Sequence, residues 1–239
     1  MSTFVLVHGA WHGGWCYKRV AALLRKAGHE VYTPTLTGLG ERSHLMSPAV
    51  TLETHIEDIV NVIRWEELSD IVLCGHSYGG MVITGVADRI PDKIHALVYL
   101  DAFVPNNGEA VIDRIDPDMR AGMRDDARQH GDGYLMSPIP AAVFNVNASD
   151  AAWVDRMCVK HPLKCFEQKI VLTGAFARVR RHSYVLATGW GGPPPSPFVP
   201  IAERLRQDPG WKVADLKCGH DVMVDMPKET ADILIAAGA

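Results

Sequence analysis

Residues 71–80 read Ile-Val-Leu-Cys-Gly-His-Ser-Tyr-Gly-Gly, and this stretch decides the fold. An apolar run typical of a buried strand ends in the pentapeptide Gly75–Gly79, and a helical pattern follows from Gly80 to Ile90. A G-x-S-x-G sequence between a strand and a helix predicts a nucleophile elbow, a sharp turn that exposes the hydroxyl of its serine, here Ser77. Glycines suit the flanking positions because a Cβ would clash in so tight a turn. The alternative is an ordinary serine in a glycine-rich turn, and the flanking elements argue against it.

The composition predicts one globular domain with no charge pattern for a large partner. A chain of 239 residues can build one large core and is short for two domains. Its net charge of −4 gives no footprint for nucleic acid or an anionic membrane. Its five cysteines include no C-x-x-C pair, which favours reduced thiols in the cytoplasm over a disulfide framework or a zinc site. The apolar run Phe4–Val7 is too short for a signal peptide or a membrane span.

Strand and helix patterns alternate along most of the chain. Such alternation predicts an α/β fold, a mostly parallel sheet with helices on both faces, in which ligands bind at the carboxyl ends of the strands. We expect strands at residues 4–7, 29–36, 71–76, 95–100, 184–187 and 213–216, and helices at 15–27, 52–63, 80–90 and from Pro227 onward.

The stretch from Pro105 to His182 breaks this alternation. Its helical patterns are short, and it lies between two strands of the core. We therefore predict an inserted helical cap over residues 105–182, between core segments 1–104 and 183–239 of a single domain. The short helices are expected at residues 140–144, 150–158 and 163–170, and the proline-rich residues 191–197 predict a stiff loop.

A serine hydroxyl is a poor nucleophile unless a base takes its proton. His220 is the best candidate among 11 histidines, because it follows the last strand pattern and a glycine. Its place late in the chain also fits, since hydrolases with this elbow have their histidine last in chain order. The alternative is a solvent-exposed loop histidine.

The loop His8–Gly14, after the first strand, is expected to complete the site. An oxyanion hole needs two fixed backbone N–H groups. One is expected from Tyr78, directly after the serine, and the other from Ala10. A substrate pocket is expected from Trp11 and His12 of this loop and from three residues of the cap, with packing of the cap onto the core as the alternative. The three cap residues are Phe144, Trp153 and Met157.

Four segments together resemble the α/β-hydrolase family, in the branch of plant salicylate methylesterases and (S)-type hydroxynitrile lyases. They are Phe4–Trp15, Gly75–Gly80, Leu97–Pro105 and Gly219–Asp221. Within that branch, residues 144–147, 152–156 and 219–227 are similar to bacterial esterases that cleave the methyl carbamate carbendazim. The resemblance implies a serine hydrolase that forms a covalent acyl-enzyme with a small-molecule substrate and needs no metal or organic cofactor.

The acid that should orient His220 is not where this branch usually has it. The expected loop reads Gly189–Pro193 and contains no carboxylate. We assign the role to Asp101, which ends the strand after the nucleophile helix, as in the haloalkane dehalogenases that the position resembles. Asp215 is the main competitor but lies within the last strand. Asp221 follows the histidine too closely to reach its ring easily.

Three other functions share this fold and stay open at this point. A lyase acting on cyanohydrins would use the same serine and histidine, but such lyases have a lysine directly after the histidine, where this chain has Asp221. A non-catalytic receptor for a small ligand is disfavoured by the intact pair of Ser77 and His220. A cofactor-free dioxygenase is the third. We expect small, neutral, apolar or aromatic substrates, and a homodimer is compatible with the sequence.

Overall fold

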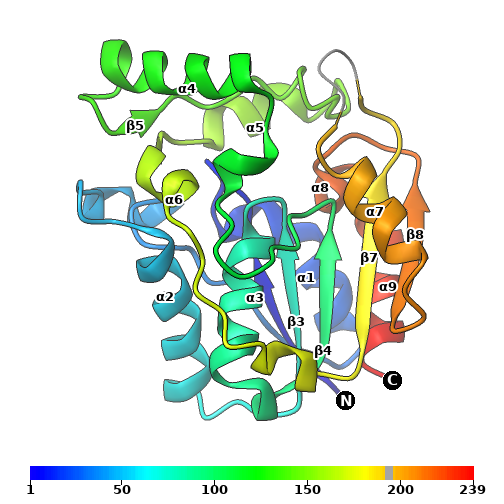
Figure 1. Cartoon of the computed structure of the whole chain (residues 1–239). Coiled ribbons are helices and arrows are strands. Elements are labelled where there is room, and N and C mark those ends of the chain that lie inside the picture. Colours follow the sequence, from blue (N-terminus) through cyan, green and yellow to red (C-terminus); the bar gives the residue numbers. More distant parts are fainter. Residues whose placement is uncertain (192–195) are drawn as a thin grey trace.

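Six parallel strands form the central sheet, in the order β2-β1-β3-β4-β7-β8 (Figure 1). The computed structural model describes residues 1–191 and 196–239, so the predicted loop at 191–197 lies partly outside the described residues. The predicted α/β fold is confirmed. The strands are β1 (Thr3–Val7), β2 (Glu30–Tyr32), β3 (Ile71–His76), β4 (Ile94–Leu100), β7 (His182–Ala187) and β8 (Trp211–Leu216).

Helices cover both faces of this sheet because its strands are apolar on both sides. Phe4 and Leu6 of β1 pack on the face of α1 (Lys18–Lys26), α8 (Val222–Asp225) and α9 (Pro227–Ala237). Val5 and Val7 pack on the face of α2 (Leu52–Trp65), α3 (Gly79–Arg89) and α7 (Val199–Arg206). Side chains of a strand alternate between faces, so continuous apolar runs are what a sheet buried on both faces requires.

The strand register brings the ends of β1, β3 and β4 to one edge. Val7 lies opposite Gly75, and His76 lies opposite Leu100. The residues that follow these strands therefore meet at the carboxyl edge of the sheet, where open α/β sheets bind ligands.

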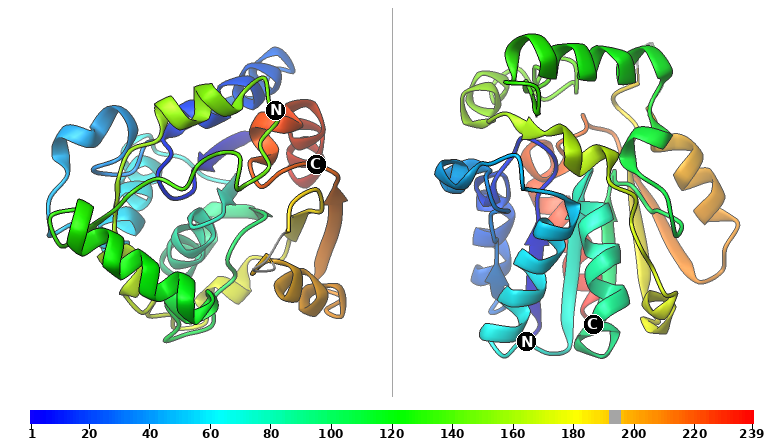
Figure 2. Two further views of the ribbon diagram at one scale, coloured as in Figure 1. Left: turned by 90° about the horizontal axis from the view of Figure 1, so that it is seen from above. Right: turned by 60° about the vertical axis from the view of Figure 1, so that its left-hand side comes forward.

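The chain between β4 and β7 crosses above this edge (Figures 1 and 2). It contains η4 (Val111–Arg114), α4 (Pro117–His130), α5 (Ala151–Met157), α6 (Leu163–Glu167), η5 (Ala175–Arg178) and a two-stranded antiparallel pair of β5 (Leu135–Met136) and β6 (His161–Pro162). No helix among the described residues is long and apolar enough to cross a membrane.

Several predicted boundaries were wrong, each for a local reason. The helix expected at 15–27 begins as the 3₁₀ segment η1 (Gly14–Tyr17), and two further 3₁₀ segments are η2 (Gly40–Leu45) and η3 (Pro91–Lys93). The strand expected at 29–36 ends at Tyr32, two residues before Pro34, which has no N–H for a strand ladder.

The segment between β4 and β7 differs more from the prediction. Residues 140–144 form turns rather than a helix, and α4 was not predicted at all. Only Ala127 of α4 is buried, so this helix lacks the apolar periodicity that reveals most helices. It is set instead by its first turn, where the Asp116 carboxylate caps two amides and Pro117 follows.

Of the six buried histidines, four are almost completely inaccessible and lie at and around the carboxyl edge of the sheet: His8, His55, His76 and His161. Their exposed fractions are 0–1%, and burial lowers the pKa of each one, to about 3 for His8 and about 4 for His55. Burial also lowers the pKa of His76 and His161 well below the ordinary value. All four are therefore neutral at pH 7, which avoids the cost of a buried unpaired charge.

Hydrogen bonds fix the neutral form of His8 independently. Its Nε2 accepts from the Leu36 amide at 3.1 Å, and its Nδ1 lies 2.8 Å from the Gly9 carbonyl oxygen, to which it donates. An amide only donates and a carbonyl only accepts, so this ring carries one proton. It connects the loop after β1 to the segment after β2.

These histidines predict a steep loss of stability in acid. Below pH 6.5 these four histidines bind protons in the unfolded chain but not in the native chain. The free energy of unfolding therefore decreases as the pH falls. Four such groups give an upper limit of about 4 kcal/mol between pH 6.5 and 5.5. Urea unfolding at both pH values measures this loss. His161→Gln should reduce it by about a quarter, and exposed His44→Gln should not; equal stability at the two pH values contradicts the account.

Candidate active site

Ser77 follows β3 in a backbone conformation that L-residues rarely adopt. The φ angle of Ser77 is +53°, and Ser77 is only partly buried. The turn leaves no room for a side chain at Gly75, where a Cβ would lie 2.6 Å from the Gly79 carbonyl oxygen. The strain is held in place because the Ser77 carbonyl accepts hydrogen bonds from the amides of Gly80 and Phe103. The hydroxyl is thereby presented at the carboxyl edge of the sheet.

Asp101 and His220 meet beside this serine's strand. His220 Nδ1 donates to Asp101 Oδ2 at 2.7 Å, and the Asp101 side chain is fully buried. Two further donors reach the carboxylate, Trp190 Nε1 at 2.8 Å and the Ala187 amide at 3.0 Å. Three donors suit an ionised carboxylate. Because Nδ1 carries the proton, His220 Nε2 keeps its lone pair for a proton transfer.

The two competing carboxylates lie elsewhere. Asp215 on β8 accepts from Arg206, and its side chain is 47% exposed. Asp221 is buried, but its Oδ2 lies 3.1 Å from His12 Nε2 rather than against the ring of His220. The structure therefore places Asp101, and neither competitor, in hydrogen-bond contact with the candidate base.

Aromatic rings enclose His220. The Phe198 ring stacks on it at 5.1 Å with an interplanar angle of 8°, and the Phe144 and Trp190 rings lie 5.0 and 4.8 Å away. The backbone is also fixed, since the His220 amide donates to the Phe144 carbonyl at 2.9 Å. Excluding water around the Asp101–His220 bond strengthens it.

The two candidate oxyanion donors flank Ser77. The loop after β1 packs directly on the elbow, since a Cβ at Gly9 would lie 3.0 Å from Ser77 Cβ. Within the described parts of the chain, the amides of Ala10 and Tyr78 donate to no backbone or side-chain acceptor, whereas the next amide, Trp11, donates to His161 Nδ1. Free, rigidly held amides are what an oxyanion hole requires.

The candidate pocket residues separate into two groups. Trp11 and Phe144 lie together, with ring centroids 6.4 Å apart, and Phe144 also contacts the base. Trp153 instead packs against Trp15 at 5.0 Å on the other sheet face, and Met157 is half-buried at the end of α5. His12 is buried and faces Asp221.

Sequence reasoning missed Trp190 and Phe198. The loop after β7 lacks a carboxylate, but its tryptophan can donate a hydrogen bond to one. The signal was available, because Trp190 lies just beyond the end of β7, at the same edge as Asp101. Phe198 follows the proline-rich segment, which contains residues outside those described, and had no such signal.

Among the residues that the structure describes, two buried groups have side chains of the kinds that bind metals. One consists of His55, His161 and Cys165, and the other of His76, His220 and Asp221. In the first, both nitrogens of His55 are engaged, Nδ1 with the Tyr78 hydroxyl at 2.9 Å and Nε2 with the Thr37 carbonyl at 3.0 Å. A metal would have to break these bonds, so the group is better suited to holding Tyr78 in place.

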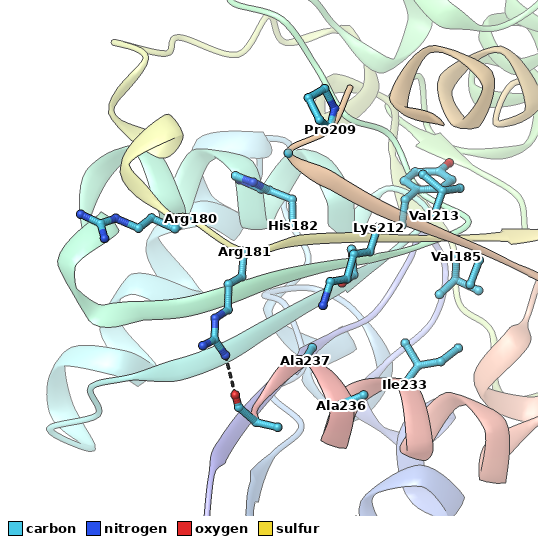
Figure 3. Close-up of a pocket in the computed structure, with 15 residues that line it drawn as sticks. Arg180, Arg181, His182, Val185, Pro209, Lys212, Val213, Ile233, Ala236 and Ala237 are labelled. Atoms are coloured by element: carbon cyan, nitrogen blue, oxygen red, sulfur yellow. Dashed lines mark hydrogen bonds between the residues drawn. The ribbon is translucent and has the colours of Figure 1, made fainter. Parts of the chain in front are cut away.

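A separate cavity of about 670 Å³ lies at the N-terminal half of β7 and β8, away from the carboxyl edge of the sheet (Figure 3). Arg181 and Lys212 line it, and Arg181 donates to the Ala239 carbonyl at 2.6 Å. None of the residues lining this cavity is Ser77, Asp101 or His220. We place the chemistry at the serine and histidine, because reaction needs a nucleophile near a base and size alone does not supply one.

Comparison with known proteins finds relatives that are named as esterases. The carbendazim hydrolyzing esterase of Nocardioides sp. (strain SG-4G) is 52% identical over 246 residues, which cover 100% of both chains. Methylesterase 2 of Arabidopsis thaliana is 36% identical over 105 residues, 43% of this chain and 40% of that protein.

A solved structure is similar over the whole chain. It is an extracellular α/β-hydrolase from a Paenibacillus species, described as sharing structural and functional homology with tobacco salicylic acid binding protein 2. Its TM-score is 0.85 at 27% identity, covering 100% of this chain and 99% of that one. The model of the alpha/beta hydrolase family matches residues 4–233. The chain therefore belongs to the alpha/beta hydrolase family.

Proposed function

We propose that this chain is a serine esterase for small apolar or aromatic esters, methyl carbamates included. The observation that carries the proposal is the 2.7 Å bond from His220 Nδ1 to the buried Asp101 carboxylate, beside a serine at an elbow with φ of +53°. The relatives named as esterases support the same class of reaction. No metal or organic cofactor takes part in the proposed mechanism.

The reaction begins with attack of Ser77 Oγ on the carbonyl carbon of the substrate. His220 Nε2 takes the hydroxyl proton, and Asp101 stabilises the imidazolium that results. Negative charge moves to the carbonyl oxygen, where the Ala10 and Tyr78 amides stabilise it. Collapse of this intermediate breaks the bond to the leaving group, which receives the proton from His220.

Water completes the turnover by the same route. His220 removes a proton from water as it attacks the acyl-enzyme, and the proton then returns to Ser77 Oγ as the acid departs. A methyl carbamate can follow the same route because its carbonyl also bears an alkoxy leaving group, although its nitrogen makes the carbonyl less electrophilic than that of an ester. The amides that hold the oxyanion do not distinguish the two substrates.

The surroundings of the base favour small, uncharged substrates. Phe144, Trp190 and Phe198 surround His220 with aromatic surface, and Trp11 adjoins Phe144. Aromatic walls bind flat apolar groups well and leave charged ones without partners. The 52% identical relative is named for hydrolysing carbendazim, which supports methyl carbamates as substrates.

Nothing in the geometry favours the lyase reading over ester hydrolysis. A cyanide anion needs a positive charge beside the catalytic histidine, but the following residue is Asp221. Its carboxylate is ionised, because burial, which opposes ionisation, is outweighed by His12, and the pKa of Asp221 is lowered well below its ordinary value. The pair of Asp221 and His12 has no net charge, so it offers a cyanide anion no net positive charge of the kind that a lysine would supply.

Replacing the nucleophile should stop the reaction without unfolding the chain. Ser77→Ala removes the only proposed attacking atom, so kcat for a p-nitrophenyl ester should fall at least roughly 10³-fold. Labelling by a fluorophosphonate should be lost as well. Circular dichroism and thermal unfolding provide the control for folding. A folded variant with near-wild-type activity would remove the basis of the proposal.

Asp101 and Asp215 provide a matched comparison of carboxylates. Asp101→Asn should lower kcat by roughly 10³- to 10⁴-fold, because an amide stabilises neither the correct tautomer nor the imidazolium. Asp215→Asn should leave kcat within about twofold, since that side chain is half-exposed and bonds to Arg206. The reverse order of effects would show that the acid is misassigned.

Substrate choice can be measured with one panel. Acetate and butyrate esters of p-nitrophenol should have higher kcat/KM than the palmitate ester, and aryl methyl carbamates should be hydrolysed. Mandelonitrile should release cyanide no faster than the buffer does. Preference for palmitate would exclude the small-substrate proposal, and rapid cyanide release would favour the lyase.

A further inference from the structure

A second buried pair of ionisable residues, His12 and Asp221, lies next to His220 in the fold. His12 Nε2 and Asp221 Oδ2 are 3.1 Å apart, with exposed fractions of 3% and 0%. His12 Nδ1 lies 2.8 Å from the Ala10 carbonyl oxygen. Both partners of the ring are acceptors, so both nitrogens donate and His12 is an imidazolium. Trp15 stacks on it at 5.1 Å, which suits a buried cation.

The titratable neighbours agree with this charge state. Burial opposes the charge on His12, but the Asp221 carboxylate outweighs it and raises the pKa of His12 well above its ordinary value. His76 Nε2 lies 3.7 Å from Asp221 Oδ1 but donates to the His220 carbonyl at 3.0 Å and is neutral. Cys158 Sγ is 4.0 Å from His12 Nδ1. His12 is thus the partner that balances the charge of Asp221.

The pair joins the two loops that the proposed reaction depends on. His12 holds the carbonyl of Ala10, whose own amide is a candidate oxyanion donor. Asp221 directly follows His220 in the chain and precedes α8. A displacement of about 1 Å between a base and an oxyanion donor is enough to cost roughly 10²-fold in rate. A short, buried, charged hydrogen bond between these loops is well placed to prevent one.

We propose that His12 and Asp221 are positioning residues, which hold the oxyanion loop and the His220 loop in register through one buried ion pair. This proposal rests on the serine esterase mechanism above. Neither residue touches the substrate in it; both act through Ala10 and His220. The plant lyases that the sequence resembles have a lysine where Asp221 stands, so the same bridge could not form in them.

The test compares His12→Gln, Asp221→Asn and the double variant His12→Gln/Asp221→Asn. Rates are expressed per site labelled by a fluorophosphonate, so that a smaller folded fraction does not count as slower chemistry. Each single variant should lower kcat by roughly 10- to 100-fold per labelled site, with KM within about threefold. The double variant should be no slower than the slower single variant, because the bridge is already broken by either change.

Inhibition by a trifluoromethyl ketone separates positioning from mere support of the fold. This inhibitor adds to Ser77 and places an oxyanion against the Ala10 and Tyr78 amides, so its inhibition constant should rise in parallel with the loss of kcat/KM. The matched control is Asp88→Asn. Asp88 is buried and accepts from Thr173 and Phe176 away from the site, so its loss should lower stability and leave kcat per labelled site unchanged.

The outcomes separate the two proposals. Unchanged kcat per labelled site in the single variants, or additive losses in the double variant, would overturn the positioning role alone. If a single variant yields no labelled sites, the double variant decides, since its two amides can keep a neutral hydrogen bond. Failure of the unchanged chain to be labelled at Ser77 would overturn both the esterase mechanism and the positioning role.

Discussion

The hydrogen bond between His220 and Asp101 is the interaction on which the rest of the site depends. It joins the chain after β8 to the end of β4, across β7, which lies between them in the sheet. Its carboxylate is held by the backbone of β7 and by Trp190, so the sheet itself fixes the direction in which the imidazole points. The elbow then needs only to present a hydroxyl at the same edge. In the proposed mechanism, the acid that orients His220 lies directly after β4, whereas this branch usually has it on the loop after β7.

The cost of burying a charge explains which of the buried histidines are neutral and which is charged. A buried imidazolium is costly unless an anion balances it, whereas a buried neutral ring needs no counter-ion. His8, His55, His76 and His161 take the neutral solution, and His12 takes the charged one opposite Asp221. The site therefore contains two buried carboxylate–histidine pairs, Asp101–His220 and Asp221–His12, and the proposed reaction uses the first as its base and orienting acid. The other occupies the position between the loops.

The sequence was enough to predict the sheet, the elbow and the order of the elements, because apolar runs on a parallel sheet and a strand–turn–helix motif are local signals. It also pointed to Asp101, by elimination among carboxylates at strand ends. It could not predict α4, which buries only Ala127 and so has no periodic pattern. Nor could it predict the ring packing around His220 or the partner of His12, because these contacts join residues about 20 to 210 positions apart and depend on how the loops fold over the edge.

The most direct measurement of the central claim is to trap the covalent intermediate. An aryl methyl carbamate, whose acyl-enzyme should be hydrolysed slowly, is mixed with the chain, the reaction is stopped in acid, and the peptides are analysed by mass spectrometry. The account predicts an added acyl mass on the peptide that contains Ser77, absent from the Asp101→Asn chain stopped at the same time. An adduct on another residue, or full turnover with no adduct while product forms in an initial burst, would contradict it.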